Sequence, residues 1–146
     1  MKTSTKLTLI TAATIAATIA LPATAHAGLP PAFQTPSGNI MCWIADDAAA
    51  CSIVDYTYGE RQRPSDCGPG EWPNHFWLFE GKPVSVDCSD TPPGTYHGLR
   101  TDRTLDYGQT KSVGVMTCAS EPSGVTCTDT SSGHFFRVSR DSYELG

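Results

Sequence analysis

A chain of 146 residues with 15 acidic against ten basic side chains has the size of one domain and too little positive charge to favour nucleic acid. It has no run of basic residues that could follow a phosphate backbone, and its acidity repels anionic lipid surfaces as well. Six cysteines, an even number, are typical of an exported protein whose fold is held by disulfides.

Residues 1–27 predict a cleavable secretory signal. Lys2 and Lys6 form a basic start, residues 7–21 are apolar apart from four threonines, and residues 25–27 (Ala-His-Ala) form a cleavage site. The apolar stretch is shorter than the ~20 residues of a membrane-spanning helix. We therefore expect no membrane span in a secreted mature chain, extracellular or associated with the cell envelope. Without Lys2 and Lys6, eight basic residues face 15 acidic ones, a formal net charge of −7.

After the signal, residues 28–37 predict an extended arm because they contain three prolines, with Phe33 as its apolar anchor. Residues 38–146 are expected to form a single disulfide-linked β domain. Within it, residues 39–44 and 50–56 predict a first hairpin with Asp46 and Asp47 at its tip.

The remaining segments alternate between strands and loops. Residues 57–74 predict a long loop rich in proline and glycine, and residues 90–103 predict a second loop. Four more strands are expected at residues 75–80, 83–88, 112–119 and 124–128, and a last one at 134–139. Because no helical period occurs outside the signal, the fold class is all-β: a small, disulfide-stapled antiparallel barrel or sandwich with long loops rich in proline and glycine.

Two pairs of cysteines have the same spacing, Cys-x8-Cys. A turn centred on Pro122 and Ser123 places Cys118 opposite Cys127, within reach of a disulfide, although a bulge at the following glycine would shift this register by one. The same reasoning pairs Cys42 with Cys51, and elimination leaves Cys67 with Cys88. No short Cys-x2-Cys spacing of a zinc site occurs, so we expect neither a metal nor a cofactor.

One run of the chain, residues 35–42 (TPSGNIMC), resembles the opening of small exported domains that are common in actinobacteria. Similar marks follow at residues 88–91 (CSDT), 105–108 (LDYG) and 124–127 (GVTC), and at the close, SGHFF with Ser139, Arg140 and Tyr143. The chain departs from that pattern at Phe135, where a second glycine is expected. The resemblance, over about residues 33–145, implies a shared small β fold and secretion. It implies no activity, because the family has no known function.

No catalytic motif is present. The sequence lacks the G-x-S-x-G elbow, a phosphate-binding glycine loop and H-E-x-x-H. The mature chain has three histidines, His75, His97 and His134. His134 opens the last expected strand, where Asp106 or Tyr107 could meet it, but hydrogen bonding to a neighbouring backbone group is the simpler interpretation. We assign no catalytic residue and expect the protein not to be an enzyme.

Arg140 follows the last expected strand. Because the chain has 15 acidic residues, an internal carboxylate is a nearer partner for it than the carboxylate of a ligand. Asp106 and Asp90 are the candidates, and we expect a structural salt bridge here.

Aromatic side chains are the candidates for a ligand surface. Alternation in residues 75–80 places Trp77 on the face opposite Phe76. Trp72 in the preceding loop, Trp77 and His134 could form a surface that stacks on a sugar or a protein partner. The alternative is that both faces of this strand are covered, since a small domain needs its large apolar residues inside. We expect Trp43 in the core.

The sequence therefore favours a secreted, non-catalytic binding module that acts through the loops at residues 57–74 and 90–103. Its partner is expected to be an extracellular protein or a glycan, bound by a monomer. Two alternatives stay open: a small secreted hydrolase with a site around His134, and an inhibitor of secreted enzymes with a protruding loop fixed by Cys67 and Cys88.

Overall fold

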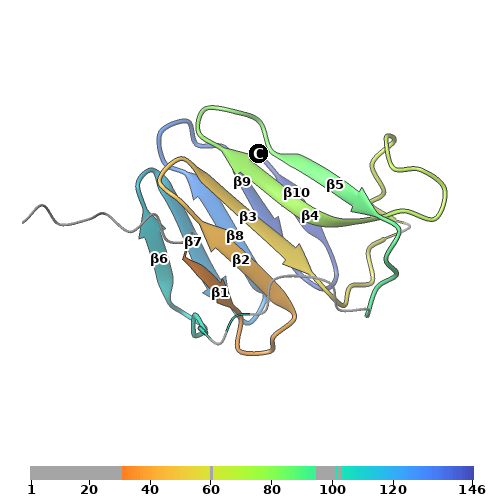
Figure 1. Ribbon diagram of the computed structural model, residues 1–146, viewed down its shortest axis with the longest axis horizontal. Helices are drawn as coiled ribbons and strands as arrows, with labels where there is room; N and C mark the ends of the chain where they lie inside the picture. Colours follow the sequence, from red (N-terminus) through yellow and green to blue (C-terminus); the bar gives the residue numbers. More distant parts are fainter. Residues whose placement is uncertain (1–30, 60, 95–100, 102) are drawn as a thin grey trace, which may run out of the picture.

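The computed structural model describes residues 31–59, 61–94, 101 and 103–146, which form two antiparallel five-stranded sheets packed face to face (Figure 1). The two sheets are separate and do not close on each other, so the all-β prediction is confirmed and the sandwich, rather than the barrel, is the architecture. The expected signal, most of the arm before Phe33, and His97 lie outside the described residues.

Sheet A is formed by the first half of the chain. Its strands follow chain order, each antiparallel to the next, so that every connection joins neighbours. They are β1 (Ala32–Gln34), β2 (Ile40–Ile44), β3 (Ala48–Ile53), β4 (Trp72–Phe79) and β5 (Ser85–Ser89).

Sheet B is formed by the second half in the same manner, in the order β10-β9-β8-β7-β6. Its strands are β6 (Thr110–Val113), β7 (Met116–Glu121), β8 (Gly124–Asp129), β9 (Phe135–Val138) and β10 (Tyr143–Leu145). Each hairpin is local, but the contact between the two sheets joins the halves of the chain.

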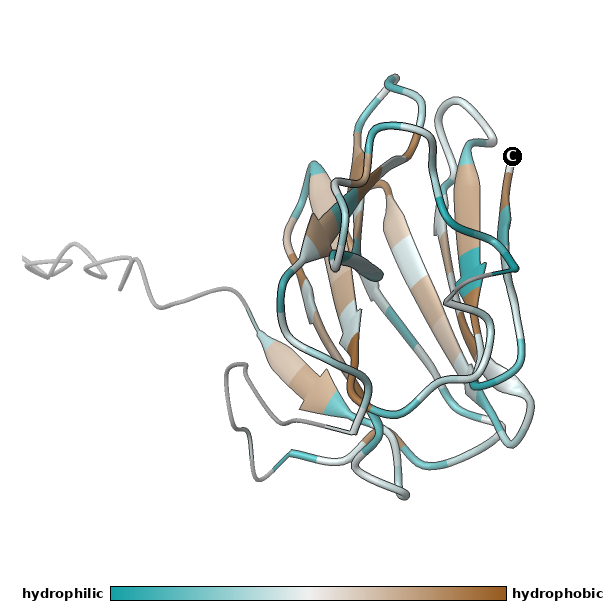
Figure 2. Ribbon diagram, turned by 90° about the vertical axis from the view of Figure 1, so that its right-hand side faces the viewer, coloured by the Kyte–Doolittle hydropathy of each residue, from teal (hydrophilic) through white to brown (hydrophobic). Residues whose placement is uncertain are grey.

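The core lies between the sheets because one residue in two on each strand points inward. Phe76 and Leu78 of β4 and Phe136 and Val138 of β9 are all fully buried, and the rings of Phe76 and Phe136 lie 5.8 Å apart across the core. Figure 2 shows the sheets from the side, with the apolar residues concentrated in the strands and the connecting segments largely hydrophilic. In the part of the chain that the structure describes, no helix is long and apolar enough to span a membrane.

The six cysteines form the two pairs that the spacing favoured, Cys42–Cys51 and Cys118–Cys127, and the pair left by elimination, Cys67–Cys88. In both Cys-x8-Cys hairpins the two cysteines are directly opposed in the register. Gly124 pairs with Glu121 at the end of the second hairpin, so the shift by one residue that a bulge there would cause does not occur.

The prediction of one strand over residues 112–119 was wrong. A turn at Gly114 divides this segment into β6 and β7. Gly114 has φ +55°, and a Cβ atom there would collide with the backbone of Asp46, while the Val115 N–H donates to the Asp46 oxygen at 2.9 Å. The turn therefore docks on the β2–β3 turn of the other sheet, which only a glycine permits.

Two further strands differ from the prediction. β10 was not predicted, and β4 begins at Trp72 and not at residue 75. Pro73 lies inside β4, where a proline is usually excluded because it cannot donate to the ladder. It is tolerated because β3 pairs with β4 only from His75 onward, which leaves Pro73 with β5 as its single neighbour.

Candidate functional site

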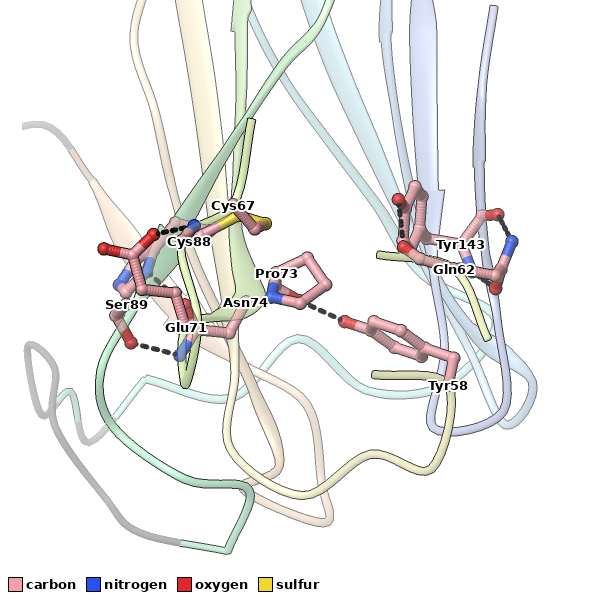
Figure 3. Close-up of a disulfide and its surroundings, with 11 residues drawn as sticks. Tyr58, Gln62, Cys67, Glu71, Pro73, Asn74, Cys88, Ser89 and Tyr143 are labelled. Carbon is pink, nitrogen blue, oxygen red and sulfur yellow. Dashed lines mark hydrogen bonds between the residues drawn. A yellow bond between two sulfur atoms is a disulfide. The ribbon is translucent and has the colours of Figure 1, made fainter. Parts of the chain in front are cut away.

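The predicted binding loop between β3 and β4 is anchored to the sandwich by a buried tyrosine cluster (Figure 3). Tyr58 is fully buried, and its hydroxyl donates to the Pro73 carbonyl oxygen at 3.0 Å. Its ring stacks on Tyr56 at 4.6 Å and meets Tyr143 edge-on at 5.2 Å. Burial raises the pKa of Tyr56 to about 12, and burial with the two neighbouring tyrosines raises the pKa of Tyr58 further.

Gln62 of the same loop supports β10. Its side-chain amide donates to the Tyr143 carbonyl oxygen and accepts from the Tyr143 N–H, both at 3.0 Å, as the peptide of a neighbouring strand would (Figure 3). The Tyr143 hydroxyl donates back to the Gln62 carbonyl oxygen at 2.6 Å. These bonds satisfy the backbone N–H and carbonyl of Tyr143 at the edge of sheet B, which helps to hold a strand of three residues there.

The far end of this loop is tied to sheet A. Cys67 is bonded to Cys88 on β5, and the Glu71 carboxylate accepts from the Gly68 N–H (Figure 3). Close by, buried Asn74 donates to the Ser89 hydroxyl at 2.9 Å. The loop thus braces one edge of the sandwich by contacting both sheets.

The outward faces of the two sheets differ in chemistry. Outward positions on sheet B are mainly polar, as expected for a sandwich in water. They include Thr117, Thr126, Thr128, Arg137 and Glu144.

Outward positions on the middle strands of sheet A are mainly apolar. They alternate with Cys42, Cys51 and Phe76, which point into the core between the sheets, and among the outward residues Met41 and Ala50 are buried as well. The outward set is Met41, Trp43, Ala50, Ser52, His75, Trp77 and Phe79.

The register of sheet A turns these side chains into a hollow. Trp43 on β2 and Trp77 on β4 both lie opposite Ala50 on β3, and their rings meet edge to face at 5.9 Å. Met41 and His75 likewise lie opposite Ser52 in the next row. Since the middle strand carries the small residue in both rows, a space of about 250 Å³ remains, which is also lined by Ala32 and Thr101.

Phe79 and Trp77 extend the aromatic surface beyond the hollow. Their rings are 6.2 Å apart and nearly parallel, at 2°. Phe79 is 46% exposed, which makes it one of the most exposed large apolar side chains of the described residues. The indole Nε1 of Trp77 is buried and has no hydrogen-bond partner within the described residues.

The three residues predicted to form a ligand surface do not come together. Only Trp77 lines the hollow. Trp72 packs partly buried against the core, with its ring against the backbone of Gly59, and His134 lies in the β8–β9 connection of the other sheet. The prediction that Trp43 belongs to the core was wrong, because Cys42 and Ile44 on either side of it occupy the inward positions.

A signal for the missed residues is present in the sequence. If Cys42 opposes Cys51 in an antiparallel hairpin, then Trp43 opposes Ala50 and Met41 opposes Ser52. The pairing with β4 could not be derived in the same way, because a long loop separates β3 from β4.

His134 does not contact Asp106 or Tyr107 as proposed from the sequence. Its Nδ1 lies 3.2 Å from the Gly146 oxygen, the backbone contact that was the simpler interpretation. The nearby carboxylate of Asp129 accepts from the hydroxyls of Ser131 and Ser132, both at 2.6 Å, and from the Gly81 N–H at 2.7 Å. These bonds hold the pKa of the Asp129 carboxyl well below its usual range, so this group is engaged in structure.

A polar cleft of about 750 Å³ lies where the β1–β2, β7–β8 and β9–β10 turns meet. Arg140 forms an ion pair with Asp55 at 2.8 Å, so Asp106 and Asp90, the predicted partners, were wrong. The backbone of Asp55 is held by the Asn39 side chain, which donates to its oxygen at 2.9 Å and accepts from its N–H at 2.7 Å. Arg140 therefore forms a salt bridge within the protein, as expected, although with a different carboxylate.

Three sulfur atoms, those of Cys42, Cys51 and Cys127, lie close enough together to hold a metal ion. All three belong to disulfides, and none of the six cysteines is free. Because a metal requires the thiolate form, these sulfurs are not ligands.

Comparison with known proteins assigns the chain to a family. The model of a family of unknown function, DUF6636, matches residues 13–145. The chain belongs to DUF6636. No curated protein and no solved structure matches it. Membership in DUF6636 assigns no ligand and no reaction, so the roles of the residues above rest on their geometry alone.

Proposed function

We propose that this DUF6636 protein is a secreted, non-catalytic binding module whose ligand occupies the hollow on the outer face of sheet A. The observation that carries the proposal is the row Trp43–Ala50–Trp77. A sandwich needs apolar residues only between its sheets, and the outer face of sheet B is accordingly polar. Sheet A differs from sheet B in carrying two half-buried tryptophans on its outer face, and large apolar groups grouped on a surface are typical of binding sites.

The proposed location outside the cell rests on two observations. The sequence of residues 1–27 has the parts of a secretory signal. All six cysteines are paired in disulfides, which persist in oxidising compartments. We take residues 28–146 as the mature protein, a monomer that is either free or associated with the cell envelope, and its single β domain includes β1 of the arm as well as residues 38–146.

A hydrolase around His134 is less well supported. A general base has to lie within hydrogen-bond reach of its nucleophile and be oriented by a third group. The described ring contact of His134 is with the Gly146 oxygen, and the carboxylate of Asp129 is engaged by Ser131, Ser132 and Gly81.

The second alternative, an inhibitor of secreted enzymes, also has less support than the binding module. The loop at Cys67 contains two tight turns, in which the Cys67 N–H donates to Pro64 and the Glu71 N–H donates to Gly68. A segment that inserts into the cleft of another enzyme as an added strand has to be extended. Because the chain turns at Cys67, this part of the loop is not extended and does not have the shape of such an inserted strand.

The test uses the indole N–H signals of the three tryptophans in a nitrogen-15 NMR spectrum of the mature protein. Trp43→Phe, Trp72→Phe and Trp77→Phe assign the signals. The protein is titrated with oligosaccharides, short apolar peptides and a fatty acid. We expect one class to shift the signals of Trp43 and Trp77, while that of Trp72 stays in place.

The matched variants separate the hollow from the rest of the surface. Trp77→Ala should abolish the shift of the Trp43 signal. Phe135→Ala, which removes a partly buried ring from the outer face of sheet B, should leave it intact. If every ligand class leaves Trp43 and Trp77 unshifted, or if the shifts centre on the loop at Cys67 or on His134, the hollow is not the binding site.

A further inference from the structure

We propose that the occupant of the hollow is an uncharged glycan, held by one sugar ring stacked on the indoles of Trp43 and Trp77. This inference rests on the proposed function and adds the class of the ligand. Four properties of the hollow support it: its size, the polar groups among its apolar walls, its position over the middle of a sheet, and the charge around it.

The size of the hollow suits a single ring. Its volume of about 250 Å³ is below the ~300–1,000 Å³ of sites for drug-sized molecules. A standard protein partner would cover about 800 Å² of one surface, which is much more than this hollow offers. A chain that places one ring in the hollow and continues over the exposed face of Phe79 fits these dimensions.

The lining combines aromatic walls with polar groups. Ser52 lies on the middle strand between Met41 and His75, and Thr101 contributes a second hydroxyl. Ser52 is partly exposed, so a purely apolar ligand such as a fatty acyl chain that covered its hydroxyl would remove this group from water, at a cost of ~1–3 kcal/mol. A sugar ring has an apolar C–H face for the indoles and hydroxyls at its edge for Ser52 and Thr101.

The position of the hollow disfavours an extended peptide. A peptide bound as an added strand pairs its backbone with the free edge of a sheet. The hollow lies over β2, β3 and β4, each of which already has a ladder neighbour on both sides. The backbone groups of these strands are therefore occupied, and recognition has to come from side chains.

The charge near the hollow disfavours an anionic glycan. Asp87 lies opposite His75 on β5, and exposed Asp46 and Asp47 form the tip of the hairpin that carries Trp43. The mature chain has a formal net charge of −7, so sulfated or uronic acid polymers are repelled.

The test is binding of the mature protein, measured by calorimetry and by the indole signals, to a panel of uncharged tetrasaccharides of glucose, N-acetylglucosamine and mannose. We expect at least one member to bind and to shift Trp43 and Trp77. Trp43→Ala and Trp77→Ala should each weaken binding at least tenfold, and Ser52→Ala about threefold to tenfold. Phe135→Ala on sheet B should bind as the wild type does, and near-UV circular dichroism should show each variant folded.

A charged comparator tests the electrostatic argument. Dextran and dextran sulfate of equal length share a backbone, and we expect the sulfated form to bind no tighter than the uncharged one at low salt. Binding of the sulfated form alone would overturn the inference.

The outcomes separate this inference from the proposed function. If a peptide or the fatty acid shifts Trp43 and Trp77 while no tetrasaccharide does, the hollow is a binding site and the glycan assignment is wrong. If a tetrasaccharide binds but shifts residues of the polar cleft beside Arg140 in place of the tryptophans, the assignment is wrong as well. If nothing in either panel shifts the tryptophans, both proposals fail.

Discussion

The Sγ atoms of Cys51 and Cys127 lie 3.8 Å apart, so the disulfides of the two sheets touch at the centre of the core. Each bridge joins directly opposed residues with Cα atoms 4.1 Å apart, close to the ~4.5 Å of a non-hydrogen-bonded pair. The Cys42–Cys51 bridge also affects the outer face of sheet A. By holding Cys42 opposite Cys51, the bridge also holds Trp43 opposite Ala50, and this register is what forms the hollow.

The first prediction compares two disulfides. Replacing Cys42 and Cys51 together by alanine should lower the free energy of unfolding by more than about 3 kcal/mol, because the loss of loop closure is joined by a void beside Cys127. Replacing Cys67 and Cys88 should cost about 3 kcal/mol, since these residues are only partly buried. Guanidinium unfolding of both variants measures the difference.

An explanation by loop closure alone predicts the opposite order, because Cys67 and Cys88 are 21 residues apart and Cys42 and Cys51 only nine. If the Cys67 and Cys88 variant is the less stable of the two, the packing of the touching disulfides adds nothing.

The second prediction concerns Asp129, which ties the β8–β9 turn to Gly81 of sheet A. Its lowered pKa means that the folded protein releases this proton more readily than the unfolded chain, whose aspartates titrate near pH 4. The stabilisation is therefore complete above about pH 5 and is lost as the pH falls below 4. Thermal unfolding between pH 2 and 7 should show this loss.

Asp129→Asn keeps the shape of the side chain and removes the titration. We expect it to be less stable than the wild type at pH 7, and the gap should narrow as the pH approaches 2. A gap that is the same at pH 7 and pH 2 would show that the charge of Asp129 is not what stabilises the turn.

The third prediction separates two stacked tyrosines. Tyr58→Phe removes the hydrogen bond to Pro73 and should cost about 1 kcal/mol. Tyr56→Phe should change stability little or increase it slightly, because the buried Tyr56 hydroxyl has no partner within the described residues. Urea unfolding of the two variants measures both effects, and equal losses would contradict this account.

The same tyrosines predict the alkaline limit of the fold. Their pKa values are raised in the folded protein, Tyr56 to about 12, so the unfolded chain loses these protons first as the pH rises. Stability should therefore fall above about pH 10. In an absorbance titration, Tyr56 and Tyr58 should ionise together with unfolding, because burial opposes their ionisation in the folded protein.

The fourth prediction tests the support of β10. Gln62→Ala removes both amide bonds to the backbone of Tyr143, and we expect it to cost about 1–2 kcal/mol. The Tyr143 N–H should then exchange with deuterium faster than in the wild type. Arg61→Ala, at the exposed neighbouring position, is the control and should leave that exchange rate unchanged.

Local pattern was enough for the strand class and for the disulfides. The pairing of Cys118 with Cys127 follows from the turn at Pro122 and Ser123, which lies within ten residues of sequence. Phe33 was predicted as the anchor of the arm, and it is buried in the core. These features depend on contacts close in sequence, where spacing and turn chemistry suffice.

The features that were missed depend on contacts across the fold. β10 pairs with β9 and is also bonded by Gln62, 81 residues away in sequence, and the turn at Gly114 docks on Asp46 of the opposite sheet. His134 and Trp72 looked equivalent to Trp77 in sequence, but each lies on a different part of the sandwich. The hairpin encodes β2 as one neighbour of β3, but no local signal encodes β4 as the other.

The sequence by itself determined that this chain forms short strands joined by disulfide-linked hairpins, because alternation and turn residues act over a few positions. Only the tertiary structure decided that the sheets form a sandwich and that Trp43 and Trp77 meet across Ala50. The physical reason is that a surface hollow depends on the side chains of three neighbouring strands at once. One of those strands, β4, reaches its place through the long loop that Tyr58 and Cys67 anchor.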